Sequence, residues 1–284
     1  MSLQETSSKS IFYSIFVFFL KFSSKDTKYH FMVTPDTLFT GKNCIYFKEI
    51  NSTNVYATDL IAKTSPPEGT CVITDFQTAG NGQIGRFWHS ESGKNLLISY
   101  IFYPTALKVK EQFLLNIISG LAVYDVISFF VKNVKIKWPN DIYVNNKKIA
   151  GILVQNTLRN DNIKSTVIGV GLNINETLFP LEIPNPTSLT IETNASYSVE
   201  DVYCRLSTRL EYYYLKLKSG KTSELKIMYQ DALFRRDDEA NFQDGKDVVF
   251  KGTIKGVNDD GKILIMMDDG SNHAFGFREI SFLI

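Results

Sequence analysis

Residues 134–172 read VKIKWPNDIYVNNKKIAGILVQNTLRNDNIKSTVIGVGL, and this stretch decides the fold class. The apolar runs at 134–138, 149–155 and 166–172 each have the length and β-branched content of a strand. Asparagine-containing turns at 145–146 and 160–161 separate them. Because strands so close together leave no room for crossover helices, the stretch predicts a mixed β-sheet and not repeated βαβ units.

Further strands and helices are expected on both sides of this stretch. Short apolar runs at 71–75 and 96–102 predict two more strands. Ser52 is a suitable N-cap for a helix that ends near residue 63, before a Ser-Pro-Pro turn. Apolar residues at helical spacing predict a helix of about 25 residues after Pro104 and a second long helix over 198–220. Residues 34–238 are therefore predicted to form one α/β domain of the α+β type.

The two ends of the chain have a different character. Short apolar runs between 247 and 277, joined by turns at 259–261 and 269–270, predict a small β-barrel over 239–284. A β-domain of this size is too small to be stable alone, so we expect it to dock on the main domain. Residues 1–33 are predicted to be an N-terminal extension, because the apolar run at 11–20 is shorter than the roughly 20 residues of a membrane span.

The composition excludes several classes of protein. The chain has 284 residues, 44% of them hydrophobic, and 31 Lys and Arg against 30 Asp and Glu leave no basic excess for binding nucleic acid. Cys44, Cys71 and Cys204 form no C-x-x-C pair, so neither a disulfide framework nor a cysteine zinc site is expected. Such cysteine usage favours a reducing cytoplasm as the location. The three histidines are scattered too, which gives no pattern for metal-centred or histidine-centred catalysis.

The segment GNGQIG at 80–85 matches the G-x-G-x-x-G fingerprint of dinucleotide sites but lacks its context. No helix pattern follows the loop, and no acidic residue ends the next strand, so the Rossmann interpretation fails. What remains is a glycine-bearing loop that ends in Arg86 and Trp88. Glycines let backbone N–H groups approach an anion, arginine adds a fixed cation, and tryptophan offers a flat face to a ligand ring. Taken alone, the loop is explained better as an ordinary surface loop.

A second set of residues favours a ligand site. Lys137 ends a predicted strand just before Pro139, which makes the chain turn, and ligands of open sheets lie outside the carboxyl ends of strands. Lys148 precedes the apolar strand at 149–155, and GVGLN at 169–173 ends another strand with close-approach glycines and an amide. Each feature has a structural explanation, such as a solvated lysine, a turn proline or a packing glycine. Their joint occurrence in this order favours a binding site.

These motifs resemble those of the biotin protein ligase family, the biotin–[acetyl-CoA-carboxylase] ligases. The resemblance covers roughly residues 40–284 and rests on STN (52–54), QTAGNGQIGRFW (77–88), KWPND (137–141), KIAGIL (148–153) and GVGLN (169–173). It implies an ATP-dependent enzyme that converts biotin and ATP to biotinyl-5′-AMP and pyrophosphate, then transfers biotin to a lysine of a biotin carboxyl carrier protein. It also implies a catalytic domain that binds biotin and ATP at 34–238 and an SH3-like fold for the C-terminal β-domain. Residues 1–40 have neither the length nor the basic helix of a DNA-binding module, which indicates the form without an N-terminal helix-turn-helix.

The resemblance also implies roles for individual residues. Biotin binding is implied for Ser52, Thr53, Asn54, Gln77, Gly80, Lys137, Gly151 and Gly169. Contacts with ATP or the adenylate are implied for Asn81, Gln83, Arg86, Trp88, Lys148 and Asn173, with Trp88 beside the adenine. Lys137, near the biotin carboxylate and the α-phosphate, and Arg86, on phosphate, are the implied catalytic residues. ATP and biotin are the substrates, Mg²⁺ accompanies the phosphates, and no protein side chain is assigned as a metal ligand.

Elementary electrostatics supports these roles. The carboxylate of biotin must attack a phosphate that is already anionic, and two like unit charges ~4 Å apart repel by roughly 4 kcal/mol at an effective dielectric constant of about 20. Lysine, arginine and Mg²⁺ offset that repulsion. The ureido ring of biotin is uncharged, so it needs the hydroxyl and amide partners that Ser, Thr and Gln supply.

The glycine loop departs from the family pattern G-R-G-R-x-G-R, because Asn81 and Gln83 stand at the first two arginine positions. Loss of a cation at phosphate predicts a rate lower by about one to three orders of magnitude, by analogy with removal of an oxyanion donor. We therefore expect a working ligase with a weaker hold on its adenylate.

Two other functions remain open at this point. A lipoate or octanoate protein ligase would share the fold and the adenylate chemistry, although the KWPND and STN motifs argue against it. A biotin-binding sensor with weakened catalysis is compatible with Asn81 and Gln83, although Lys137, Arg86 and Asn173 are retained. The expected partner is the carrier domain of a biotin-dependent carboxylase. A homodimer is compatible with the sequence, and neither nucleic acid nor a membrane is expected as a partner.

Overall fold

The computed structural model describes residues 33–80, 82 and 87–283. The N-terminal extension predicted at 1–33 therefore lies, apart from Val33, outside the described residues. So do three of the predicted site residues, Asn81, Gln83 and Arg86.

The main domain is built on a seven-stranded sheet with the strand order β1-β2-β3-β7-β6-β5-β4. The first pair, β1 and β2, is parallel and all other neighbours are antiparallel, which confirms the predicted mixed sheet. The bounds are β1 (Cys44–Ile50), β2 (Cys71–Gln77), β3 (Leu96–Phe102), β4 (Val134–Lys137), β5 (Asp141–Val144), β6 (Lys147–Arg159) and β7 (Asn162–Leu172).

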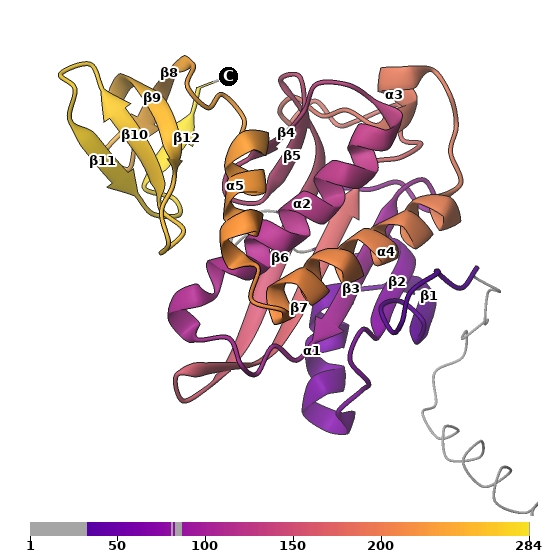
Figure 1. The fold of residues 1–284 in the computed structure, drawn as a ribbon. Helices are drawn as coiled ribbons and strands as arrows, with labels where there is room; N and C mark the ends of the chain where they lie inside the picture. Colours follow the sequence, from indigo (N-terminus) through magenta and orange to yellow (C-terminus); the bar gives the residue numbers. More distant parts are fainter. Residues whose placement is uncertain (1–32, 81, 83–86, 284) are drawn as a thin grey trace, which may run out of the picture.

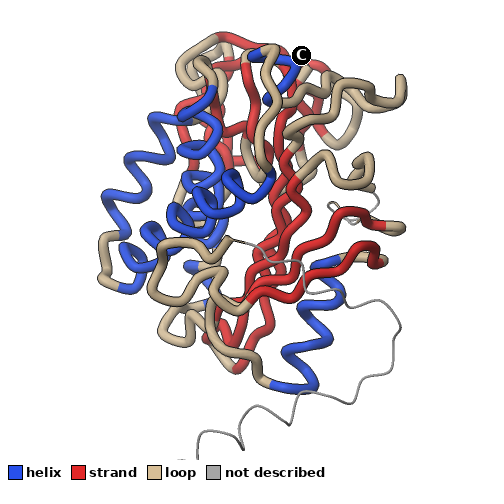
Figure 2. Tube along the Cα trace, turned by 90° about the vertical axis from the view of Figure 1, so that its right-hand side faces the viewer, coloured by secondary structure: helices blue, strands red, loops and turns tan. Residues whose placement is uncertain are grey.

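Helices cover both faces of this sheet, as Figures 1 and 2 show. One face carries α2 (Phe113–Phe130), α4 (Val199–Lys218) and α5 (Thr222–Ala232), which enclose the main hydrophobic core. The other face carries α1 (Thr53–Thr64), where Ala57 packs with Val72, Ile101 and Val167 in a smaller cluster. The 3₁₀ helix η1 (Val109–Glu111) and the short helix α3 (Leu189–Thr193) lie in connections.

Helix α2 is apolar on all sides, which suits a helix that other elements enclose. It runs along the sheet between α4 and α5, and most of its residues are buried. With η1 it forms one segment, Val109–Phe130, that is long and apolar enough to cross a membrane by length and composition. In its most apolar window of 18 residues, 67% is buried within the fold, which is the property of a core helix.

The sequence predictions of individual elements were partly wrong at their edges. The helix expected to run for about 25 residues after Pro104 is shorter, because η1 and a turn precede α2. In the main domain, strands β1 and β5 and helices α3 and α5 were not predicted. Strand β5 has only four residues and β1 carries two charged side chains, so neither gives a clear apolar run.

The C-terminal domain is a five-stranded antiparallel sheet with the order β11-β10-β9-β8-β12. Its strands are β8 (Glu239–Asp244), β9 (Val249–Val257), β10 (Ile263–Met267), β11 (Asn272–Phe275) and β12 (Ile280–Phe282). Phe242, Ile254, Ile263 and Ile265 are buried between the curled strands.

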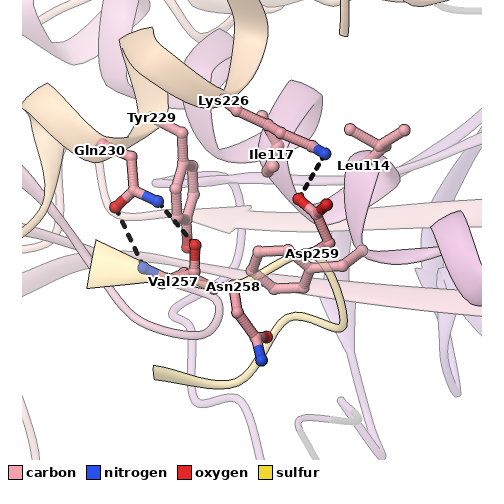
Figure 3. A pocket seen from close by; sticks show the side chains of 9 residues that line it. Leu114, Ile117, Lys226, Tyr229, Gln230, Val257, Asn258 and Asp259 are labelled. Carbon is pink, nitrogen blue, oxygen red and sulfur yellow. Dashed lines mark hydrogen bonds and ion pairs between the residues drawn. The ribbon is translucent and has the colours of Figure 1, made fainter. Parts of the chain in front are cut away.

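Helix α5 and the turn between β9 and β10 join the two domains (Figure 3). The Gln230 side chain donates from Nε2 to the Val257 carbonyl over 2.7 Å and accepts from the Val257 N–H over 3.1 Å. Lys226 forms an ion pair with Asp259 at 2.5 Å. Behind this turn, Trp138 donates from Nε1 to the carbonyl of Gly261 over 2.9 Å. The tryptophan of the KWPND motif is 3% exposed, so it fixes the domain interface and does not offer its face to a ligand.

Candidate active site

A cavity of about 480 Å³ lies over the strands in the middle of the main sheet. The N-terminus of α1, the strand pair β6–β7 and residues 179–186 form its walls. Apart from Gly80, every predicted site residue within the described part of the chain lines it: Ser52, Thr53, Asn54, Gln77, Trp88, Lys137, Lys148, Gly151, Gly169 and Asn173. Segments from the whole length of the main domain therefore meet at one place.

One side of the cavity, here called the amide end, consists of Ser52, Thr53, Asn54 and Gln77. Gln77 ends β2, and its Oε1 accepts from the Thr53 N–H over 2.8 Å and from the Thr53 hydroxyl over 3.1 Å. The other three residues, at the start of α1, are at most 4% exposed. Ser52 holds the N-cap position with an extended backbone, but its side chain makes no cap hydrogen bond. Its hydroxyl therefore does not serve the helix.

Asn54 is held by two residues that sequence reasoning missed, Ser99 and Gln155. The Ser99 hydroxyl lies 2.5 Å from Asn54 Oδ1 and 2.8 Å from Thr53 Oγ1, and Asn54 Nδ2 donates to Gln155 Oε1 over 2.9 Å. Gly169 passes so close that a Cβ there would lie 2.8 Å from Asn54 Cγ. Only glycine fits at this position of β7, which gives a physical reason for this glycine of the GVGLN motif.

The other side, here called the tryptophan end, consists of Trp88, Lys148, Gly151, Gly171 and Asn173. The indole of Trp88 lies on the bare backbone of β6 and β7, since a Cβ at Gly151 or Gly171 would come within 2.8 Å of the ring. Gly80 does not line the cavity, but its carbonyl accepts from the Trp88 N–H over 2.9 Å and so closes the loop between them. This hydrogen bond holds the backbone of Trp88 against that of Gly80.

Two buried polar atoms at the tryptophan end have no hydrogen-bond partner among the described residues. They are Nε1 of Trp88, a donor, and Oδ1 of Asn173, an acceptor. The other half of the Asn173 amide donates to the Thr187 carbonyl over 2.9 Å, which fixes its orientation. A bound molecule with both a donor and an acceptor would satisfy the two atoms, and buried polar groups normally have such partners.

The two lysines of the cavity have different surroundings. Lys148 Nζ forms an ion pair with Asp141 Oδ1 at 2.7 Å and lies 5.5 Å from the ring centre of Trp88. Lys137 Nζ lies over two aromatic rings, 5.3 Å from the centre of Tyr143 and 4.6 Å from that of Phe282. Lys148 is therefore paired with a carboxylate, and Lys137 lies against aromatic faces, which can orient an ammonium group.

Phe282 belongs to β12, so through this ring the C-terminal domain contacts Lys137, which lines the cavity. Sequence reasoning missed both Phe282 and Tyr143, and no sequence signal could have identified Phe282, because nothing in its local pattern refers to residue 137. In the part of the chain that the structure describes, no group of three or more His, Cys, Asp or Glu side chains is arranged to hold a metal ion.

Comparison with known proteins gives a consistent result. The sequence pattern of the Biotin/lipoate A/B protein ligase family matches residues 46–173. The chain is 30% identical over 236 residues to the bifunctional ligase/repressor BirA of Bacillus subtilis, which covers 81% of this chain and 71% of that protein. It is 31% identical over 149 residues to the biotin–[acetyl-CoA-carboxylase] ligase of Mycobacterium tuberculosis, covering 50% of this chain and 52% of that protein.

Solved structures show the same relationship. The biotin protein ligase of Aquifex aeolicus, in complex with biotin and ATP, superimposes with a TM-score of 0.70 at 25% identity, covering 85% of this chain and 99% of that chain. The ligase of Leishmania major in complex with biotin superimposes with a TM-score of 0.57 at 23% identity, covering 82% and 98% of the two chains, and supports the fold.

Proposed function

This chain belongs to the biotin/lipoate A/B protein ligase family, and from that premise we propose that it is a biotin protein ligase. It converts biotin and ATP to biotinyl-5′-AMP and pyrophosphate and then transfers biotin to a lysine of an acceptor protein. The observation that carries the proposal is a single cavity whose walls combine a polar but uncharged end, an aromatic, glycine-floored end and the side chain of Lys137.

The amide end suits the ureido ring of biotin. Ser52, Thr53 and Gln77 present hydroxyl and amide groups on the wall of the cavity, with no charged side chain among them. A neutral ring with two N–H donors and one carbonyl needs such partners. A charged group at this end would lose its hydration without gaining an opposite charge. Asn54 and Gly169 shape the wall behind these groups.

The tryptophan end suits the adenine of ATP. The ring of Trp88 provides a flat surface, and the donor on Trp88 Nε1 and the acceptor on Asn173 Oδ1 match a base that both donates and accepts. Gly151 in β6 and Gly171 in β7 carry no side chains, which leaves room for the indole of Trp88 against the sheet. Lys148, paired with Asp141, adds one cation at this end of the cavity.

Lys137 is assigned to the reacting atoms between the two ends. In the first step an oxygen of the biotin carboxylate forms a bond to the α-phosphorus, and the bond to the bridging oxygen of pyrophosphate breaks. An ammonium group beside both anions reduces their repulsion and stabilises the charge that develops on phosphate. In the second step the neutral amine of the acceptor lysine attacks the acyl carbon, the amine loses a proton, and AMP leaves with the electron pair.

Mg²⁺ is proposed as a companion of the ATP phosphates. Mg²⁺ commonly binds nucleotides through phosphate oxygens and one or two carboxylates, and Asp141 and Glu182 are the carboxylates on the described walls of the cavity. It would neutralise phosphate charge. Arg86, which lies outside the described residues, remains the proposed second cation on phosphate.

The remaining proposals concern the setting of the reaction. The acceptor is a biotin carboxyl carrier domain of a biotin-dependent carboxylase, and the location is the cytoplasm, which agrees with three cysteines that form no disulfide. A homodimer is proposed because an edge strand can pair with the same strand of a second copy, and β1 is an edge strand of the main sheet, whereas the other edge strand, β4, is already bridged to Leu233 through Ile136.

The test is ATP–pyrophosphate exchange by the full chain with biotin, with lipoate, or with neither. Exchange that depends on biotin supports the proposal, and exchange with lipoate alone would move the protein to the lipoate ligases. Lys137→Ala should lower the exchange rate by about 100-fold or more while biotin still binds, since it removes the cation from the developing charge. Unchanged exchange by this variant would contradict the role of Lys137.

A further inference from the structure

A fully buried carboxylate lies directly behind the tryptophan end of the cavity. Glu176 lies three residues after Asn173, beyond the end of β7, and its side chain is 0% exposed. Its Oε2 accepts from the Asn95 amide and from the Glu91 N–H at 3.2 Å. Its Oε1 has no hydrogen-bond partner among the residues described, although the imidazole Nε2 of His89 lies 3.2 Å away as an ion-pair partner. A buried carboxylate requires a hydrogen-bond donor or a counter-charge, and the imidazole of His89 is the group placed beside this one.

His89 directly follows Trp88 and lines the cavity next to it. Its side chain is 42% exposed, so one side of the imidazole faces solvent and the other faces Glu176. The backbone of Trp88 is fixed on one side by its hydrogen bond to Gly80. The pair between His89 and Glu176 fixes the chain on the other side.

The same carboxylate also reaches the opposite wall of the tryptophan end. Asn95, which donates to Glu176, accepts through Oδ1 from the Ile174 N–H over 2.8 Å. Ile174 is the neighbour of Asn173, which lines the cavity and whose buried amide oxygen has no hydrogen-bond partner among the described residues. Glu176 therefore connects Trp88, through His89, with Asn173, through Asn95 and Ile174. The two walls that would hold an adenine share one buried anchor.

We infer that His89 and Glu176 are positioning residues that set the affinity of this enzyme for adenine nucleotide, by fixing Trp88 and Asn173 at the spacing that the base requires. This inference rests on the proposed function and deepens it. Neither residue touches the amide end, so biotin binding does not depend on them. The motifs of the sequence gave no indication of either residue.

Among the residues that the structure describes, the neighbouring charged groups have partners of their own and do not replace His89. Glu91 on the same segment is paired at its side chain with Lys94 at 2.6 Å, and that pair is exposed. Lys148 at the tryptophan end is paired with Asp141. Loss of His89 therefore leaves a buried carboxylate without its imidazole partner, whereas loss of both His89 and the charge of Glu176 leaves no buried charge to compensate.

The experiment compares His89→Ala, Glu176→Gln and the double variant with the wild-type chain. The Kd for ATP and the Kd for biotin are measured by calorimetry, and the KM for ATP and kcat by biotin-dependent pyrophosphate exchange. Glu91→Gln is the matched control, because it removes a paired glutamate from the same segment without changing the cavity.

We expect His89→Ala and Glu176→Gln each to raise the Kd and KM for ATP about tenfold, with the biotin Kd and kcat within about twofold of wild type. The double variant should bind ATP no more weakly than His89→Ala, because a single interaction has been removed. It also serves as the folded reference should His89→Ala fail to fold. Glu91→Gln should be unchanged.

Equal losses of ATP and biotin affinity, additive losses in the double variant, or an unchanged ATP Kd would each overturn the inference. A wild-type chain that binds ATP but shows no biotin-dependent exchange would overturn the proposed function, and the ATP Kd values of the variants would still decide the inference. A wild-type chain that binds no ATP would overturn both.

Discussion

The two ends of the cavity differ in whether their polar side chains already have hydrogen-bond partners. At the amide end, Thr53, Asn54, Gln77 and Ser99 already hydrogen-bond one another, so the wall is complete before a ligand arrives. At the tryptophan end, a donor on Trp88 and an acceptor on Asn173 are buried without partners among the described residues. A pre-formed wall selects a small rigid molecule at little entropic cost, whereas an incomplete wall gains its last hydrogen bonds only from the ligand. We therefore expect the affinity for biotin and the affinity for ATP to respond to different kinds of substitution.

The largest effect is expected from Gly169→Ala, which breaks the amide end. A methyl group at this position of β7 would overlap the Asn54 amide, which is itself buried and held by Ser99 and Gln155. Because the neighbours cannot move apart without losing these bonds, biotin affinity should fall by about 100-fold. Calorimetry with biotin measures this change. Gly245→Ala, whose nearest atom would lie 3.9 Å away, is the control, and a similar loss in both variants would point to general destabilisation.

Gly171→Ala makes the matching change at the tryptophan end. This glycine stands two residues further along β7, and a methyl group there would meet the Trp88 ring. Trp88 is only partly buried, so its indole gives way at a lower cost than the buried Asn54 amide, and we expect a smaller loss, of about tenfold, in ATP affinity. Biotin affinity should stay within about twofold. If Gly171→Ala weakened biotin as much as ATP, the two ends would not be independent.

Phe282→Leu tests whether the C-terminal domain contributes to the region between the ends. The change keeps an apolar residue in β12 but removes the ring 4.6 Å from Lys137 Nζ. A cation–π contact of about 1 kcal/mol corresponds to a factor of roughly five, so kcat for exchange should fall about fivefold with both substrate affinities retained. Phe275→Leu, in β11 of the same domain, is the control. Equal activity of the two variants would contradict a role for Phe282.

An effect as small as that of Phe282→Leu is expected from Gln83→Arg, which restores one arginine of the family loop pattern. Residue 83 lies outside the described residues, so the expectation comes from charge alone. A cation near phosphate at the surface adds about 1 kcal/mol, so release of biotinyl-5′-AMP should slow by roughly fivefold. Retention of labelled adenylate on a desalting column measures it. Wild-type chain that retains its adenylate as tightly as the variant would refute the idea of a weakened hold.

Much of the site could be predicted from the sequence because its motifs lie at strand ends. The KWPND and GVGLN motifs end predicted strands, and the structure puts Lys137 and Asn173 on the walls of one cavity. Residues that support the site from behind could not be found in this way. Ser99 lies in the middle of the fully buried strand β3, and Gln155 is a polar residue inside a long strand, so neither differs from an ordinary strand residue until Asn54 is placed against it.

The sequence by itself determined the class of fold and the chemistry at hand, because strand periodicity, turn residues and short motifs are local properties of the chain. It also identified the lysines, the glycines and Trp88. Only the tertiary structure decided what each one touches. It paired Lys148 with Asp141, brought Phe282 from the other domain over Lys137, and buried Glu176 behind His89. Such contacts depend on strand order and domain docking, which join residues far apart in the chain and leave no trace in the local pattern of either partner.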